Sequence, residues 1–293
     1  MLTRQKVVMA LIDQLGGTVG RTVLVKLAFL LRHETGLRDI PTFYDFVPYR
    51  FGPFSFALYR ELQALERDGY VTSSDEVFSL RDATRHMGRE KVDELSWMEQ
   101  CAVKTMVSTY GRMGKNPLVK DVYDRYPWFA TRSELTDLIP AHLPPAARVD
   151  VAVYTVGYEG RSVDGFFDHL LRSGMHAILD VRANPISRKY GFAKRSLSEI
   201  AEKLGLAYEH LPELGIPSAQ REDLCDVESY KRLLERYEHK MLPRQTAGID
   251  RLIRLLRQRP SVLVCVERDV RQCHRGRLAQ AAAARSGLPI KHL

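Results

Sequence analysis

The sequence contains no apolar stretch close to the ~20 residues that a membrane-spanning helix needs, so we expect no contact with a membrane. The N-terminus is basic and includes several apolar residues. These recur at helical spacing and are interrupted by Asp13 and Gln14, which favours a helix over a signal peptide. The sequence therefore predicts a cytoplasmic protein.

Cysteine is scarce, and the four cysteines of this 293-residue chain form no short CxxC pair: Cys101, Cys225, Cys265 and Cys273. Reduced thiols are the default for a cytoplasmic chain of this kind. The chain also lacks a P-loop, a GxGxxG motif followed by an acidic residue, an HExxH motif and a GxSxG motif. These absences argue against the common ATPases, dehydrogenases, zinc proteases and serine hydrolases.

Positive charge is concentrated in the second half of the chain. Residues 151–293 contain 24 Lys and Arg against 17 Asp and Glu, a net charge of +7. Residues 1–150 contain 20 against 19, a net charge of +1. A basic surface favours the binding of nucleic acid or nucleotides, and solubility alone is the alternative explanation.

The first 82 residues predict three helices, near residues 4–15, 21–35 and 55–68, followed by a hairpin. A loop rich in aromatic residues and proline separates the second helix from the third. Three helices before a hairpin are the order of a winged helix, a module that binds DNA in many proteins and protein in others. Because the net charge of this half is close to zero, its charge does not favour DNA over a protein as the partner.

Two further helices are predicted near residues 90–110 and 118–125, and Pro144-Pro145 indicates a linker. We therefore place a mainly helical, winged-helix-like domain at residues 1–146. A second domain follows at residues 147–293, and both lengths suit independent domains.

The second domain alternates between apolar strands and helices. Strands are predicted near residues 151–157, 177–182 and 261–267, with short strands near 207–212 and 289–293. Near-continuous Val, Ile and Leu strands separated by helices are typical of parallel sheets. We therefore predict an α/β domain with a mostly parallel sheet and helices on both faces.

Polar residues follow the predicted strands of this domain, at the edge where ligands bind in open α/β sheets. The candidates are, in chain order, Gly157, Tyr158, Glu159, Gly160, Asp180, Arg182, Asn184, Ser187, Arg188, Glu213, Cys265, Glu267, Cys273, His274 and Arg275. Their convergence on one edge of the sheet predicts a functional site.

Five motifs in the second half carry a family resemblance: TVGYEG, DVRANPISR, GF, YEHLPELG and CVERDVRQCHR. In this order they resemble the domain of unknown function 488 family, over roughly residues 152–293. The resemblance implies an α/β domain but no established reaction. The first motif of the family often has His and Ser where this chain has Tyr158 and Glu159. The first half resembles the module often fused to this domain and, more faintly, antitoxin domains with a Gly-Pro turn before a helix.

The candidate catalytic residues are Asp180, Glu267, Cys273 and His274. Asp180 is either a general base or ribose ligand, or else a helix cap or a partner for Arg182. Glu267 ends an apolar strand, where a raised pKa would suit acid–base work, and an ion pair with Arg275 is the alternative. Cys273 begins a helix, whose dipole would lower the thiol pKa and favour a nucleophile.

The candidate ligand-binding residues are headed by Arg182, Arg188 and Arg275, whose guanidinium groups can grip phosphate or carboxylate oxygens. The other candidates are Tyr158, Glu159, Asn184, Ser187 and Glu213. Gly157 and Gly160 either allow a ligand to approach the backbone or simply form a turn.

Zinc is the one metal that the sequence suggests, through Cys265, Cys273 and His274. The spacing of eight residues between the two cysteines is not a standard zinc spacing, and no fourth ligand is evident. We therefore predict no metal site here and identify no cofactor.

The leading hypothesis is an enzyme that processes nucleic acid or nucleotides by hydrolysing a glycosidic or phosphoester bond, in host defence or DNA modification by analogy. One alternative is a non-enzymatic, dimeric DNA-binding regulator that senses a nucleotide-like ligand. Another is an antitoxin-like protein that binds a partner through its first domain, which exposure of the segment 43–56 would favour.

Overall fold

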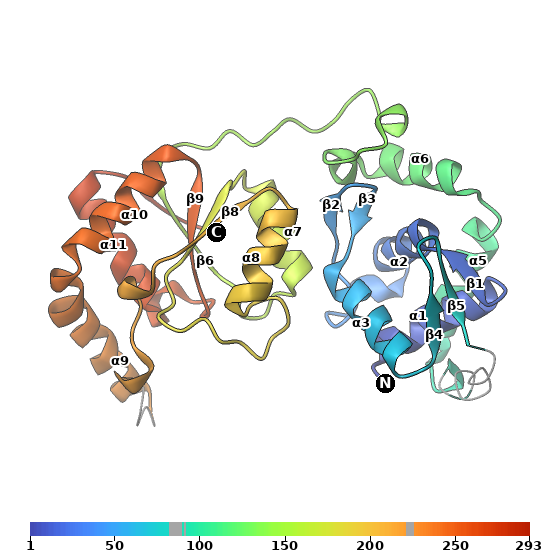
Figure 1. The fold of residues 1–293 in the computed structure, drawn as a ribbon, viewed down its shortest axis with the longest axis horizontal. Helices are drawn as coiled ribbons and strands as arrows, with labels where there is room; N and C mark the ends of the chain where they lie inside the picture. The colour runs from blue at the N-terminus through green and yellow to red at the C-terminus, as the bar shows by residue number, and fades with distance from the viewer. Residues whose placement is uncertain (82–89, 91, 221–225) are drawn as a thin grey trace. The chain divides into compact units, whose positions relative to one another are not determined.

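The computed structural model describes residues 1–81, 90, 92–220 and 226–293. The chain divides into two compact units, Met1–Pro145 and Ala146–Leu293 (Figure 1). Within the described ranges, no helix combines the length and the apolar character that crossing a bilayer requires. Cys225 and one residue of the helix predicted over 90–110, Lys91, lie outside the described residues.

The first unit is helical, with small antiparallel sheets. Its helices are α1 (Thr3–Gln14), α2 (Arg21–Glu34), α3 (Phe56–Arg67), α5 (Trp97–Tyr110) and α6 (Lys115–Arg125). The predicted hairpin is formed by β4 (Val71–Ser73) and β5 (Val77–Leu80). A strand that the sequence analysis missed, β1 (Thr18–Gly20), pairs with β5 and completes a three-stranded sheet. Three residues are too few to show the alternation that reveals a strand.

The aromatic segment before α3 is not an exposed loop. It contains a second hairpin, β2 (Val47–Tyr49) and β3 (Gly52–Phe54), and Phe43, Tyr44 and Phe46 are buried. Phe46 meets Phe29 of α2 edge to face, with ring centroids 5.3 Å apart. Exposure of the segment 43–56 would have favoured the antitoxin-like alternative, but most of its rings belong to the core of the first unit.

A fully buried lysine lies beneath this hairpin. The ammonium group of Lys26 donates to the carbonyl oxygen of Pro53 at 3.0 Å, and 1% of the residue is exposed. Burial disfavours the charged form and lowers the pKa of Lys26 from 10.5 to about 7. The first unit therefore contains a group whose protonation opposes folding.

We expect the stability of the first unit to rise with pH because of Lys26. Between pH 7 and pH 10.5 the unfolded chain binds a proton that the folded chain has lost. This group thus adds about 1.4 kcal/mol per pH unit to the free energy of unfolding over that window. The variant Lys26→Met should lack this slope.

The measurement is urea unfolding at several pH values above 7, followed by tryptophan fluorescence. Both tryptophans, Trp97 and Trp128, belong to the first unit, so the signal reports that unit alone. Equal slopes for the wild-type chain and Lys26→Met would contradict the assignment.

The second unit is an α/β domain built on a five-stranded parallel sheet. The strands are β6 (Val153–Gly157), β7 (Ala177–Asp180), β8 (Ala207–His210), β9 (Ser261–Cys265) and β10 (Ile290–His292). Their spatial order is β10-β6-β9-β7-β8, and all four neighbouring pairs are parallel. The predicted fold class is confirmed.

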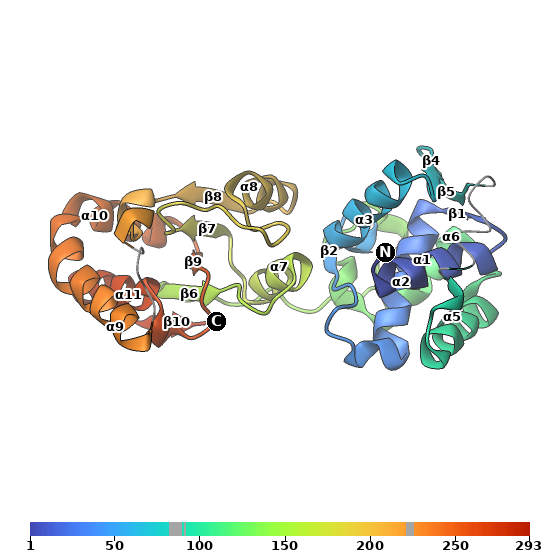
Figure 2. The same cartoon turned by 90° about the horizontal axis from the view of Figure 1, so that it is seen from below.

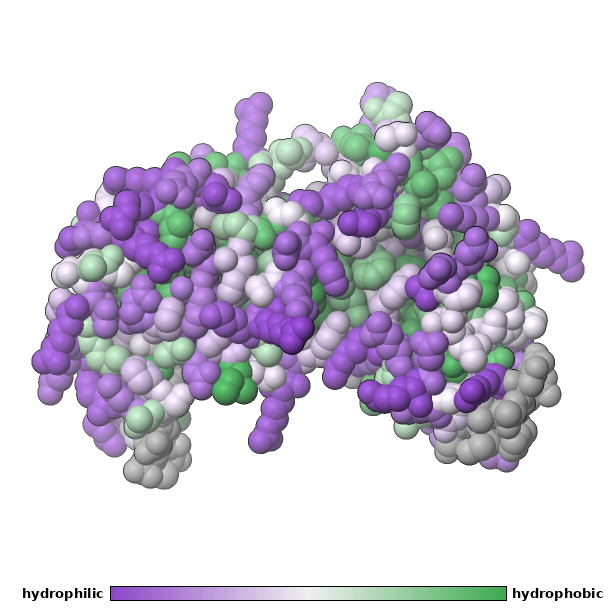
Figure 3. Space-filling view, in the orientation of Figure 1, coloured by the Kyte–Doolittle hydropathy of each residue, from purple (hydrophilic) through white to green (hydrophobic). Residues whose placement is uncertain are grey.

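Helices cover both faces of this sheet. Figures 1 and 2 show α7 (Val163–Arg172) and α8 (Lys194–Lys203) on one face, and α9 (Val227–Arg236), α10 (Thr246–Gln258) and α11 (His274–Ser286) on the other. Leu179 and Leu263 of the sheet share one core with side chains of α9, α10 and α11. The visible face of this unit is mostly hydrophilic (Figure 3).

Candidate functional site

The carboxyl ends of the central strands meet at one edge of the sheet. Gly157 at the end of β6 is paired with Cys265 at the end of β9, and Asp180 at the end of β7 is paired with His210 of β8. The helices that follow the neighbouring strands β6 and β9, α7 and α11, cover opposite faces. This is the topological switch point at which open α/β sheets bind ligands. Several of the predicted site residues, among them Gly157, Asp180 and Cys265, lie at these strand ends.

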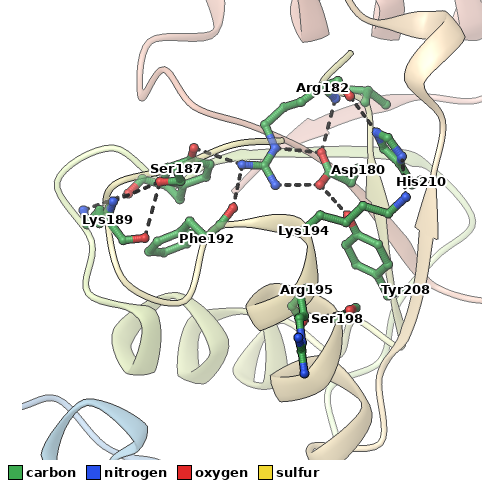
Figure 4. Close-up of polar contacts among 12 residues, drawn as sticks. Asp180, Arg182, Ser187, Lys189, Phe192, Lys194, Arg195, Ser198, Tyr208 and His210 are labelled. Atoms are coloured by element: carbon green, nitrogen blue, oxygen red, sulfur yellow. Dashed lines mark hydrogen bonds and ion pairs between the residues drawn. The ribbon is translucent and has the colours of Figure 1, made fainter. Parts of the chain in front are cut away.

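A buried ion pair occupies the β7 end of this edge (Figure 4). Asp180 and Arg182 are 0% and 4% exposed. The guanidinium group of Arg182 donates through Nε to one carboxylate oxygen at 2.8 Å and through Nη2 to the other at 2.6 Å. Tyr208 of β8 donates its hydroxyl to the same carboxylate at 2.6 Å. Burial and this carboxylate both raise the pKa of Tyr208, so the phenol stays protonated.

The remaining nitrogen of the Arg182 guanidinium is also engaged. Its Nη1 donates to the Tyr158 hydroxyl at 3.0 Å and to the carbonyl of Phe192 at 2.8 Å. The rings of Tyr158 and Phe192 are stacked with centroids 4.1 Å apart. His210 contacts the carbonyl oxygen of Arg182 through Nε2 at 2.9 Å (Figure 4). Arg182 thus ties the loop after β7 to β6 and β8.

These contacts favour the structural interpretation of Asp180 and Arg182. Both carboxylate oxygens of Asp180 accept hydrogen bonds, which leaves the group poorly placed to take a proton from a substrate. The hydrogen bonds and charge of Asp180 outweigh the effect of burial and raise the pKa of Arg182. With its guanidinium group buried and committed, Arg182 has little capacity to bind a phosphate group.

The loop after this pair is more exposed. Asn184 and Arg188 are exposed, and Ser187 is half-buried. The Ser187 hydroxyl donates to the Lys189 carbonyl at 3.3 Å and accepts from the Lys189 N–H at 3.1 Å, which is a local turn (Figure 4). Because Arg182 is buried and Arg188 is exposed, the two do not form the paired anion site that the sequence suggested.

Gly157 allows a close approach by the chain itself. A Cβ atom at this position would lie 1.9 Å from the carbonyl oxygen of Glu267, so the turn after β9 passes directly against β6. Gly160 adopts φ +77° in open space, as a turn requires. The Glu159 carboxylate accepts from the N–H of Arg268 at 2.9 Å. These residues shape the edge of the site.

Glu213 lies apart from the central cluster in its contacts. Its carboxylate is 3.8 Å from a nitrogen of Arg251 on α10.

Arg275 binds main-chain oxygens, because its guanidinium group donates to the carbonyls of Glu267 and Arg268, the latter at 3.0 Å. The proposed ion pair between the side chains of Glu267 and Arg275 is therefore replaced by a contact with the backbone.

The β9 end of the edge carries a second cluster, centred on Glu267. The Tyr230 hydroxyl donates to one carboxylate oxygen at 3.1 Å, and the Cys265 thiol donates to the other at 3.3 Å. The sulfur of Cys265 also lies 3.6 Å from Nδ1 of His274. Nε2 of His274 contacts the carbonyl oxygen of Val181 at 2.9 Å, which connects this cluster to the loop after β7.

Two pKa expectations are wrong in direction. Burial raises the pKa of Glu267, but hydrogen bonds from Cys273 and Cys265 outweigh it and hold the pKa below its ordinary value. Burial, reinforced by Cys265, raises the pKa of the Cys273 thiol well above its usual range. The helix dipole at the start of α11 is too weak to offset the loss of water, so a protonated Cys273 is a poor nucleophile.

A cavity of about 720 Å³ opens beside Glu267. Its lining combines this carboxylate with Tyr230 and the cationic side chains Lys231, Arg271 and Arg277. The sequence analysis missed Tyr230, Lys231, Arg271 and Arg277. Arg271 lies inside the motif CVERDVRQCHR and could have been noticed there, whereas Tyr230 and Lys231 lie on a helix with no local signal of function.

The fold and this edge define an α/β domain with a polar site at the switch point of its sheet. Residues 162–282 match the model of the family described as "Domain of unknown function DUF488". The second unit therefore contains a domain of this family, as the resemblance predicted, and the motif TVGYEG lies just before the matched residues. No curated protein matches the chain.

Loss of the buried carboxylate should unfold the second unit more easily. In Asp180→Asn the Arg182 cation stays buried without its partner, which costs about 3–5 kcal/mol. The exposed pair between Asp250 and Arg285, with nitrogen–oxygen distances of 2.6 and 2.8 Å, supplies the control. Asp250→Asn should lower the free energy of unfolding far less, because water screens an exposed pair.

Urea unfolding followed by far-ultraviolet circular dichroism checks this comparison. Tryptophan fluorescence should not change between the variants, because it follows the first unit. A loss for Asp180→Asn no larger than that for Asp250→Asn would show that the pair does not stabilise the fold.

Proposed function

We propose that the second unit is a hydrolase acting on a nucleotide or nucleic acid, in the cavity beside Glu267. The observation that carries the proposal is that one cavity beside Glu267 is lined by two carboxylates, of Asp226 and Glu267, and by three cationic side chains. Its volume of about 720 Å³ suits a ligand the size of a nucleotide. A glycosidic or phosphoester bond is the bond to be broken.

The cations of the cavity suit a phosphate-bearing ligand. Arg271 projects into solvent with 87% of its side chain exposed and pairs with Asp269 at 2.9 Å. Arg277 is paired with Glu238 at 3.0 Å. An Arg guanidinium group binds phosphate oxygens through two parallel hydrogen bonds, so a ligand can share these groups with their present partners.

Glu267 is the acid–base group in this proposal. Its carboxylate is half-buried and oriented by Tyr230 and Cys265, and it faces the cavity. A fixed carboxylate next to bound substrate can accept a proton from an attacking water. Asp180 is left out because its oxygens are already occupied. Hydrolysis of nucleic acid in the cytoplasm would suit host defence or DNA modification.

The test is a screen of the full chain with nucleoside phosphates and short single-stranded oligonucleotides, with products identified by mass spectrometry. Glu267→Gln should reduce the rate by about 10²–10⁴-fold. Lys231→Ala and Arg271→Ala should each raise KM by about tenfold, because each removes a phosphate contact. Glu199→Gln and Lys203→Ala, on α8, are the matched controls and should not change the rate.

Turnover that survives Glu267→Gln unchanged would refute the assignment of the acid–base group. A wild-type chain that cleaves no member of the panel would refute the proposed reaction.

The element order of the first unit supports a second candidate, a DNA-binding regulator. The elements follow in the order helix, strand, helix, hairpin, helix and hairpin, which is that of a winged helix with the β2–β3 hairpin inserted before α3. Selection of duplex DNA from a random pool by the full chain tests this candidate, which requires an enriched sequence and, for a dimer, two half-sites.

A further inference from the structure

Three potential metal ligands converge behind Glu267. The sulfurs of Cys265 and Cys273 and a ring nitrogen of His274 all lie within 4.8 Å of one another. The three residues are 0%, 1% and 1% exposed. In the described part of the chain, no other group of three such side chains has this geometry. Cys273 and His274 have no role in the function proposed above, in which Cys265 only contacts Glu267.

We propose that Cys265, Cys273 and His274 bind a zinc ion whose fourth position is open toward Glu267 and the cavity. The inference deepens the proposed function, on which the role of the open position rests. It replaces the expectation, drawn from the spacing of the two cysteines, that no metal is bound.

The distances suit a tetrahedral ion. With a zinc–sulfur bond of about 2.3 Å and a zinc–nitrogen bond of about 2.0–2.1 Å, the edge between the two ligand atoms is about 3.6 Å. The sulfur of Cys265 and Nδ1 of His274 are 3.6 Å apart. This edge therefore has the length that zinc requires, and the sulfur of Cys273 lies within 4.8 Å of both atoms.

The ring of His274 is already oriented for a metal. Because Nε2 lies 2.9 Å from the carbonyl oxygen of Val181, it carries the proton and donates it. The lone pair of Nδ1 then points toward the sulfur of Cys265. A second hydrogen bond of this kind fixes the tautomer and direction of most metal-binding histidines. The ring of Tyr237 packs edge to face against His274 with centroids 5.4 Å apart.

The fold overcomes the unusual spacing of the cysteines. Between Cys265 and Cys273 the chain leaves β9, makes a short helical turn at Val270–Gln272 and returns at the start of α11. Arg275 fixes this return by binding the carbonyl of Arg268 at 3.0 Å and that of Glu267. Ligands eight residues apart in sequence therefore meet in space.

The ligand set selects zinc and an open site. Two thiolates and an imidazole favour zinc over magnesium or calcium, which prefer oxygen ligands. A zinc ion with three protein ligands keeps a water in the fourth position, as in catalytic sites. Glu267 lies 3.3 Å from the sulfur of Cys265 and lines the cavity. A water in the fourth position would pass one proton to this carboxylate and remain as hydroxide on the ion.

The first test is metal analysis of the full chain, expressed with zinc and purified without chelators. We expect about one zinc ion per chain, as for a single three-ligand site. Cys265→Ser, Cys273→Ser and His274→Ala should each lower the content to under about a tenth of that value, since each removes a ligand. Cys101→Ser, whose thiol belongs to the first unit, should keep the ion.

Cobalt substitution of the wild-type chain keeps the proposal testable if those variants do not fold. Tetrahedral Co²⁺ bound to two thiolates should give intense visible bands and a sulfur-to-cobalt charge-transfer band. A wild-type chain that binds neither zinc nor cobalt would show that the three residues are only a packed, hydrogen-bonded cluster. Glu267→Gln should keep the metal, and its loss in that variant would overturn the open fourth position.

These experiments can refute the metal site and the proposed reaction independently of each other. A zinc-loaded chain that cleaves no nucleotide would leave the metal site standing and refute the function. Nucleotide cleavage by a metal-free chain, unaffected by chelator, would do the reverse.

Discussion

The buried pair of Asp180 and Arg182 organises the functional edge of the second unit. A charge pair taken out of water is tolerated only when its hydrogen bonds are complete, and this one is completed by Tyr158, Tyr208 and the Phe192 carbonyl. The main chain beside the pair supplies further anchors. The carbonyl oxygen of Val181, which lies between Asp180 and Arg182, accepts a hydrogen bond from His274. One short segment therefore contacts both the buried pair and the candidate metal ligands.

Sequence patterns located the elements of the second unit well, because their local signals are strong. Helix α7 begins after Ser162, whose hydroxyl caps it, and ends before Gly174, while β9 is a continuous apolar run. The first unit was harder. Strand β1 has only three residues, too few to show an alternating pattern. Strands β2 and β3 each contain a proline, which is typical of a loop, and they pair only with each other.

The sequence also predicted that candidate residues would meet at one edge of the sheet, since parallel strands all end on one side, and Gly157, Asp180 and Cys265 do end neighbouring strands. It could not assign their roles. Motif position does not reveal whether the hydrogen-bonding capacity of Asp180 is satisfied by Tyr208, which lies on another strand. Nor does it reveal that burial raises the pKa of Cys273 where the helix dipole alone would lower it. The cavity residues from α9 became visible only through tertiary packing.

The hydrogen bonds that Arg275 donates to the main chain have a consequence for which substitutions this domain can accept during evolution. Its guanidinium group grips carbonyl oxygens of Glu267 and Arg268, atoms that every amino acid possesses. On the neighbouring strand, Gly157 leaves room for the same backbone. The path of this turn is therefore set independently of the side chains it presents. A relative that keeps the arginine and the glycine can therefore carry another side chain in place of Glu267 while the backbone follows the same path. Such a substitution would change the chemistry of the cavity without changing the fold around it.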